Sequence, residues 1–344
     1  MSIKNSQITI KDIAKALKLS TSTVSRALQG HPNVNRDTKN AVVQLAHQLD
    51  YKPNSIALGL RKSKTNTLGI IVPKLVHHFF SSVISGISEV AHDLGYNVII
   101  TQTNESYFRE IENLKTLLSS RVDAICISLS KETTNYAHFD NVYKREIPLL
   151  FFDRVCDQIP TNQVMVDDYQ GAFSAVEHLI QMGCRNILHL AGPDTLSISC
   201  ERKRGYLEAH RHYQLPIHEE NIILSDHQAL GFETVLGILQ AGKSFDGVFA
   251  VNDETAIGGM IAAKKMGLKV PSDVAFIGFG NDPIAAVVEP NLSTVRQPGF
   301  AMGYAVATII IDQLLKKEKE IPFKLEKQVL STDLIIRESS RRDS

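Results

Sequence analysis

From Leu68 onward the chain repeats one unit, a short apolar run rich in β-branched residues followed by a stretch with helical spacing. Helices are predicted over residues 80–94, 108–119 and 255–266, and another runs through 178–182. The apolar runs between them are LGIIVP, NVIIT, AICISL, PLLFFD, NILHLAG, DGVFAVN and VAFIGF. Strands that alternate with helices form parallel sheets covered on both faces. About ten strands exceed one ordinary sheet, so we predict two lobes with a ligand cleft between them.

Charge is distributed unevenly along the chain. Residues 1–64 hold eleven Lys and Arg against three Asp, which leaves +8, and because the whole chain is neutral the remainder carries −8. A basic head on an acidic body indicates a polyanion-binding module attached to a body that does not bind polyanions. The basic segment therefore needs its own structural explanation.

The basic head has the pattern of three short helices. Thr9 and Asp12 form a capping box before the first apolar helical face, Ser20 caps a second helix, and Asn35 caps a third. Gly30 ends the second helix. Helix, tight turn, helix, loop and helix within about 45 residues is the helix-turn-helix arrangement.

The second helix begins with four consecutive hydroxyl residues, in the run STSTVSRALQG. Such side chains suit a cap and a first turn better than a helix interior. A recognition helix points its first turn into the DNA major groove, where hydroxyls, Thr methyls and a guanidinium can contact bases or phosphates. We expect these contacts from Thr21, Ser22, Ser25 and Arg26. The alternative is a three-helix structural or protein-binding domain with a polar surface.

Three stretches of the head resemble the DNA-binding head and hinge of the LacI/GalR family of transcription regulators. They are TIKDIAKALKLSTSTVSRALQG, VNRDTKNAV and LDYKPNSIALGLR. The ordered string T-V-S-R-A-L followed by Y-x-P-N is specific, and the resemblance continues through nearly the whole chain. It implies a DNA-binding regulator, more often a repressor, that binds a palindromic double-stranded operator as a homodimer. It also implies allosteric control by a small molecule, a sugar or sugar derivative, bound between the lobes. Thr9 and Asn33 join the head residues expected to contact DNA.

The hinge follows Pro53. Asn54 can cap a short helix, but eight residues with Gly59 at the centre cannot hold a helix alone in water. The resemblance implies that this helix forms on DNA, that Asn54 and Ala57 contact the operator, and that Leu60 inserts into the minor groove as a wedge. The alternative is a plain linker with Leu60 packed on the body.

The resemblance also implies the domain organisation. The fold class is a small all-α helix-turn-helix head plus an α/β body of two parallel-sheet lobes, similar to periplasmic sugar-binding proteins. The expected boundaries are 1–53 for the head, 54–66 for the hinge helix and linker, and 67–344 for the body, with lobe one at 67–165 and 296–329 and lobe two at 166–295 and 330–340.

Ligand residues of such a body are expected at the carboxyl ends of strands. FFDR ends one such strand, and the motifs AGPDTLSISCERKRGY and VNDETAIGG match family positions there. The expected effector-binding residues are Phe79, Phe80, Asp153, Arg154, Arg202, His227, Asn252 and Asp282. One of the two phenylalanines is expected in the core. A salt bridge across the cleft is the alternative role for Asp153 with Arg154, and Asp253 is expected to cap the helix that follows it.

One position departs from the family pattern. The family has an acidic residue two positions after the glycine of VAFIG, where this chain has Gly280. Either Asp282 replaces that acid, or the ligand is not a simple neutral sugar. In the second case Arg154 with Arg202 favours an acidic sugar or a sugar phosphate.

Other classes of protein are disfavoured. The chain has no G-x-S-x-G motif, and the adjacent Asp167 and Asp168 diverge, so we expect no enzyme activity and no cofactor. A solute-binding protein for carbohydrate uptake does not need residues 9–62. His77 and His78 are too weak a pattern for a metal site.

The remaining expectations concern location. No apolar run reaches signal-peptide length at the N-terminus or the roughly 20 residues of a membrane span. The cysteines lack metal-ligand spacing, so we expect free thiols in a bacterial cytoplasm, at the nucleoid. They are Cys126, Cys156, Cys184 and Cys200.

Overall fold

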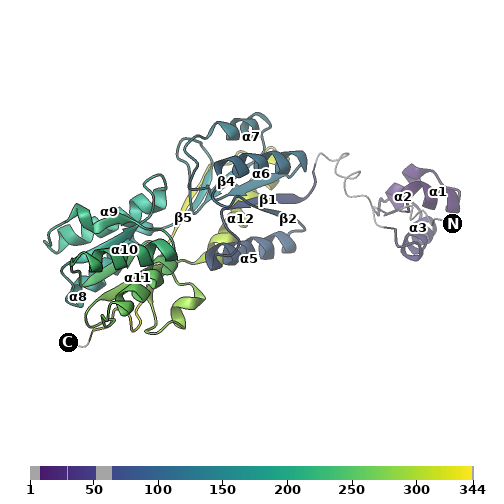
Figure 1. The fold of residues 1–344 in the computed structure, drawn as a ribbon. Coiled ribbons are helices and arrows are strands. Elements are labelled where there is room, and N and C mark those ends of the chain that lie inside the picture. Colours follow the sequence, from purple (N-terminus) through teal and green to yellow (C-terminus); the bar gives the residue numbers. More distant parts are fainter. Residues whose placement is uncertain (1–7, 29, 52–63, 343–344) are drawn as a thin grey trace. The chain divides into compact units, whose positions relative to one another are not determined.

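The computed structural model describes residues 8–28, 30–51 and 64–342, and the chain divides into two compact units, residues 1–65 and 66–344 (Figure 1). The first unit is the head and the second is the body. Each is described by itself.

The head consists of α1 (Ile10–Leu17), α2 (Thr21–Leu28) and α3 (Arg36–Gln48). Each helix start has the predicted cap. The Asp12 carboxylate accepts hydrogen bonds from the Thr9 N–H and hydroxyl at 2.8 and 2.7 Å, and Ser20 Oγ and Asn35 Oδ1 accept from backbone N–H groups three residues on. The buried core is small: Ile13, Ala14, Val24, Ala27, Val42 and Ala46.

The body contains two six-stranded sheets, and the predicted fold class is confirmed. The first sheet is parallel in the order β11-β5-β4-β3-β1-β2. Its strands are β1 (Thr67–Val72), β2 (Asn97–Gln102), β3 (Ala124–Ile127), β4 (Leu149–Phe152), β5 (Asn162–Val166) and β11 (Lys327–Leu330). The helices of this lobe are α5 (His78–Asp93), α6 (Tyr107–Ser119), α7 (Asp140–Lys144) and α12 (Gly299–Glu318).

The second sheet has the order β12-β10-β9-β8-β6-β7, and β12 runs antiparallel to β10. Its strands are β6 (Ile187–Ala191), β7 (Ile222–Leu224), β8 (Gly247–Ala250), β9 (Ala275–Gly280), β10 (Ser293–Arg296) and β12 (Asp333–Ile335). Its helices are α8 (Asp168–Gln181), α9 (Ser197–His212), α10 (Gln228–Gln240) and α11 (Asp253–Lys265). Short 3-10 turns lie at Ala137–Phe139, Glu219–Asn221 and Pro283–Ala286.

The chain crosses between the two sheets three times, after β5, after β10 and between β11 and β12. Consequently α12 and β11, late in the sequence, complete the first lobe (Figure 1). Helix α12 packs directly on α5, because Gly86 and Gly303 leave room for backbone to approach backbone, and a Cβ at either position would overlap the facing helix.

Helix α12 corrects one expectation. Its 20 residues are long and apolar enough to cross a membrane by length and composition, which the sequence analysis did not anticipate. The buried residues of this helix, among them Met302, Val306 and Ile310, belong to the core cluster that also contains Val83 and Ile87 of α5. Its apolar character is that of a core helix of the first lobe.

Candidate DNA-binding head and ligand cleft

The first turn of α2 lies at the surface of the head. Thr21, Ser22 and Arg26 are exposed, and Ser25 is partly buried. The Ser22 hydroxyl lies 2.8 Å from Ser20 Oγ, so these two hydroxyls hydrogen-bond to one another. Thr21 and Ser22 nevertheless remain exposed.

The other predicted DNA contacts are less uniform. Thr9 and Asn33 are exposed, but the Thr9 hydroxyl already donates to Asp12. Asn54, Ala57 and Leu60 lie outside the described residues.

A cavity of about 370 Å³ lies between the two lobes of the body. All eight predicted effector residues are on its wall, four from each lobe. Phe79 and Phe80 come from the start of α5, and their rings meet edge to face with centroids 5.2 Å apart. Phe80 is also part of the core, whereas Phe79 is only partly buried. The remaining six are polar or charged residues, Arg202 within α9 and the others at strand ends and helix starts: Asp153, Arg154, Arg202, His227, Asn252 and Asp282.

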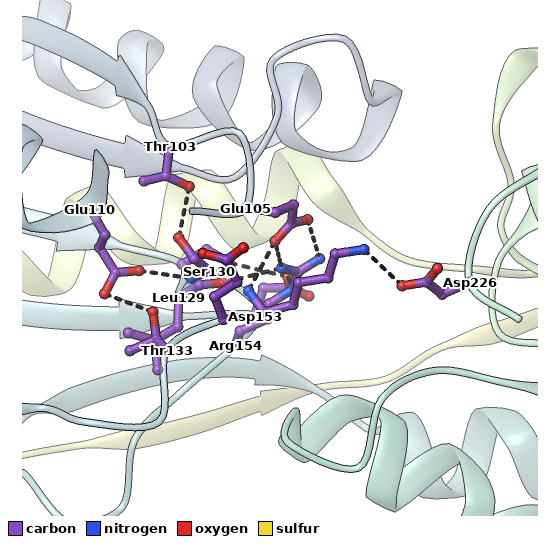
Figure 2. Close-up of polar contacts among 12 residues, drawn as sticks. Thr103, Glu105, Glu110, Leu129, Ser130, Thr133, Asp153, Arg154 and Asp226 are labelled. Atoms are coloured by element: carbon purple, nitrogen blue, oxygen red, sulfur yellow. Dashed lines mark hydrogen bonds and ion pairs between the residues drawn. The ribbon is translucent and has the colours of Figure 1, made fainter. Parts of the chain in front are cut away.

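Arg154 is held within its own lobe, so the predicted alternative of a salt bridge across the cleft is wrong for this residue. Its guanidinium donates two hydrogen bonds to Glu105, at 2.7 and 3.1 Å, and one to the Leu129 carbonyl at 3.2 Å (Figure 2). Burial raises the pKa of Glu105, but the charge and hydrogen bonds of Arg154 together with Lys131 outweigh it, and the pKa lies below its usual range. Asp153 is a more distant neighbour, with Oδ2 3.9 Å from Arg154 Nε.

Arg202 is also committed to a carboxylate of its own lobe. Its Nε and Nη2 lie 2.8 and 2.7 Å from Asp168 Oδ1, its Nη1 donates to the Val251 carbonyl at 2.6 Å, and its guanidinium carbon lies 3.7 Å from the centre of the Phe279 ring. Burial raises the pKa of Asp168 to about 7 despite the opposing charge of Arg202. Asp168 is therefore a support for the cleft arginine, a role the sequence analysis missed.

Of the two residues after β8, the one that caps the following helix is not the one expected. Asn252, not Asp253, caps α11: its Oδ1 accepts from the Thr255 N–H at 2.8 Å. Asp253 is buried and instead accepts from the Thr294 hydroxyl at 2.5 Å and the Asp282 N–H at 2.7 Å. It thus fixes the loop that carries Asp282.

The same loop explains the departure at Gly280. Its φ of +135° is a conformation that residues with a side chain rarely adopt, and an added Cβ would lie 3.6 Å from Asp253 Oδ2. An acidic residue there would strain the backbone and face a buried carboxylate. Asp282, two residues on, reaches the cavity wall without that conflict.

Three contacts join the lobes across the cleft. Lys131 Nζ lies 2.9 Å from Asp226 Oδ2 (Figure 2), the Thr195 hydroxyl donates to the Lys131 carbonyl at 3.2 Å, and His77 lies 3.5 Å from Glu254. We call the first two contacts the Lys131 clasp.

Two carboxylates hold the loop that bears Lys131. Glu105 accepts from the Lys131 N–H at 3.0 Å, and buried Glu110 accepts from the Ser130 N–H and the Thr133 hydroxyl at 2.7 and 3.0 Å (Figure 2). Glu105 therefore connects cavity-lining Arg154 to the clasp. Sequence reasoning missed these residues, because only the folded topology brings them together.

A basic helical head attached to a two-lobed body with a ligand-sized cavity defines a class, the DNA-binding regulators that carry a sensory body. Residues 9–54 match bacterial regulatory proteins of the lacI family, and residues 176–340 match the periplasmic binding protein-like domain. The chain belongs to the LacI family and is a DNA-binding transcriptional regulator.

Individual relatives support this family assignment. Catabolite control protein A of Priestia megaterium is 32% identical over 93% of this chain and 98% of its own. The ribose operon repressor of Halalkalibacterium halodurans is 30% identical, over 97% of each chain. In fold, the chain is similar to the Lac repressor dimer bound to operator and an anti-inducer, with a TM-score of 0.83 at 24% identity over 97% of this chain and 99% of that one.

Proposed function

We propose that the chain is a repressor that binds a palindromic operator as a homodimer, and that a sugar or sugar derivative between the lobes controls this binding. The observation that carries the proposal is a single cavity to which both lobes contribute charged side chains, in a chain with a LacI-family head. The related ribose operon repressor supports the sugar.

On the DNA side, we assign operator contacts to the exposed α2 residues Thr21, Ser22 and Arg26. We assign further contacts to Ser25, Thr9 and Asn33. Asn54, Ala57 and Leu60 remain proposals from the family resemblance. The domain boundaries stay as predicted, with a head at 1–53, a hinge at 54–66 and a body from 67.

On the ligand side, the eight cavity residues named above form the binding site. The Lys131 clasp responds to a ligand in that site. A ligand that contacts Arg154 or Glu105 acts on the groups that hold Lys131, and so on the contact between the lobes. The coupling between cleft and operator is expected to be about 1–3 kcal/mol. The protein acts in the bacterial cytoplasm, at the nucleoid, and has no membrane partner, cofactor or catalytic residue. A solute-binding protein for carbohydrate uptake would not need the DNA-binding head.

DNA selection from a random duplex pool, followed by fluorescence anisotropy of the selected sequence, tests the DNA half. We expect a palindromic consensus, nanomolar binding and a steep fall of affinity with salt. Arg26→Ala should weaken binding by about 10- to 100-fold, and the control Arg211→Ala, on the surface of the body, should not. Equal binding to all sequences would contradict the proposal.

A thermal-unfolding screen tests the ligand half. A ligand at 100 times its Kd adds about 2.7 kcal/mol to the stability of the body, a Tm increase of roughly 5 °C. The same ligand should change the anisotropy-measured Kd for the operator. A ligand that stabilises the body without any effect on DNA binding would reject the allosteric half.

A further inference from the structure

The two arginines of the cleft are already neutralised. Glu105 takes two hydrogen bonds from Arg154, and Asp168 takes those of Arg202 at 2.8 and 2.7 Å. Each pair lies within a single lobe, Arg154 with Glu105 in the first and Arg202 with Asp168 in the second. Opening or closing of the cleft therefore breaks neither pair. Neither arginine presents an unpaired charge to a ligand.

Among the other basic residues of the wall, Lys131, His77 and His227 lie beside carboxylates. Lys131 pairs with Asp226 at 2.9 Å, and His77 lies 3.5 Å from Glu254. His77 and, more weakly, the charge of Lys74 lower the pKa of Glu254. His227 Nδ1 lies 3.0 Å from Asp226 Oδ1.

Two carboxylates, one from each lobe, have capacity left. Asp153 Oδ2 accepts one long hydrogen bond, from the Ser128 hydroxyl at 3.3 Å, and its nearest cationic atom is 3.9 Å away. Among the described residues, none donates a hydrogen bond to the Asp282 carboxylate, while its own N–H is fixed by Asp253. Burial raises the pKa of both groups, as expected for carboxylates without a close cation.

The charge of the wall follows from these pairs. Four Lys and Arg line the cavity against five Asp and Glu, and Asp168 lies behind Arg202 as a sixth acid. An anionic ligand would add a negative charge to a wall on which acidic residues already outnumber Lys and Arg, and it would compete with Glu105 and Asp168 for the two arginines, which is unfavourable. A hydroxyl-rich ligand instead donates to the carboxylates that have capacity.

We propose that the effector carries no anionic group and that Asp153 and Asp282, from opposite lobes, accept hydrogen bonds from its donor groups. This inference rests on the proposed function and excludes uronic acids and sugar phosphates, the alternative that Arg154 and Arg202 suggested in the sequence. Asp253 is the positioning residue for Asp282, through the 2.7 Å contact to its N–H.

The experiment is a thermal-unfolding and calorimetric screen of the full chain with matched sets. Each set contains one pentose or hexose, its amino-sugar derivative, its uronic acid and its phosphate. We expect binding from an uncharged or amino member, with the matched uronic acid and phosphate at least about 10-fold weaker. An anionic member that binds as tightly as its uncharged counterpart overturns the inference but leaves the proposed function in place. No binding by any member overturns both.

Two variants sharpen the test. Asp282→Asn should weaken the uncharged ligand by about 10-fold without weakening the uronic acid further. Glu105→Gln frees Arg154 and should raise the affinity for the uronic acid relative to the uncharged sugar by about 10-fold. The control Glu112→Gln, exposed on α6, should change neither ratio. An unchanged ratio in both test variants contradicts the inference.

Discussion

Head and body place their polar side chains in opposite ways. In the head, the side chains that cap the helices find partners three residues away and remain exposed, as with Thr9 and Asp12 or Asn35 and Thr38. In the body, the charged groups of the cleft find partners 34 and 49 residues away and are largely buried. Polar groups in the head are therefore available to a partner, whereas those in the cleft are largely occupied by one another. Substitutions in the head should therefore impair operator binding alone, and substitutions in the cleft should impair the stability and ligand binding of the body.

The largest expected effect separates the regions by destroying the head alone. Val42 is fully buried in the small head core, and Val43, its neighbour on α3, is 38% exposed. Val42→Asp buries an unpaired carboxylate, which costs several kcal/mol in a domain of marginal size, so operator binding should fall by more than about 100-fold. Anisotropy measures this loss, and calorimetry should find ligand binding unchanged.

The control for that prediction is Val43→Asp, which makes the same change of charge at the surface. It should retain most of the operator affinity. If both variants lose binding equally, charge and not folding of the head is responsible. If Val42→Asp also abolishes ligand binding, the head and the body are not independent.

The second effect should fall on the body alone. Arg202 has a side chain 5% exposed, and Arg202→Met leaves the buried Asp168 without its cation, at a cost of about 3–5 kcal/mol. Thermal unfolding should detect the loss, together with lost ligand binding. Arg204→Met, at a residue 56% exposed that pairs with Glu201, should change the stability by less than about 1 kcal/mol. Equal effects would mean that the Arg202 pair is no more important than a surface pair.

A smaller effect should come from the contact between the lobes. Lys131→Met removes the ion pair to Asp226, but the Lys131 side chain is 38% exposed, so the free energy of unfolding should fall by no more than about 1 kcal/mol. Small-angle scattering without ligand should nevertheless give a larger radius of gyration, because only the Thr195 contact to the Lys131 carbonyl remains of the clasp. Lys115→Met, within α6, is the matched control. Unchanged scattering would remove the Lys131 clasp from the mechanism.

The last expected effect is a pH dependence. Burial raises the pKa of Asp253 from 3.8 to about 7, so the folded state keeps a proton that the unfolded chain has released. This contribution is complete below about pH 4 and is lost as the pH rises toward about 7. Asp253→Asn removes the ionisable group, so the Tm of this variant minus that of the parent should increase across this window. A constant difference would contradict the assignment.

The same contrast explains what the sequence could predict. The caps of the head helices depend on residues three positions apart, and the long apolar strands such as β1 and β9 carry their own pattern, so both were predicted. The edge strands β7, β11 and β12 have three or four residues and few buried side chains, and their pairing is decided by partners far along the chain. They were not predicted individually.

The cleft was predicted only in part. Family motifs and strand ends led to the eight wall residues, but the partners Glu105 and Asp168 stand in no motif and meet their arginines only in the folded sheets. Asp253 looked like a helix cap because it starts α11, yet the preceding Asn252 has the extended backbone that a cap requires. The sequence pattern could not distinguish the two neighbours.

The return of the chain to the first sheet has a consequence for synthesis. Strand β11 joins β5 across 164 residues between Glu326 and Asn162, which a ribosome needs roughly 8–33 s to translate at 5–20 residues per second. During that time the head can already fold, while the strands of the first lobe wait for α12 to cover them. The nascent regulator thus acquires its DNA-binding unit well before the lobe that is to govern it, and its exposed apolar strands are where a chaperone would be needed.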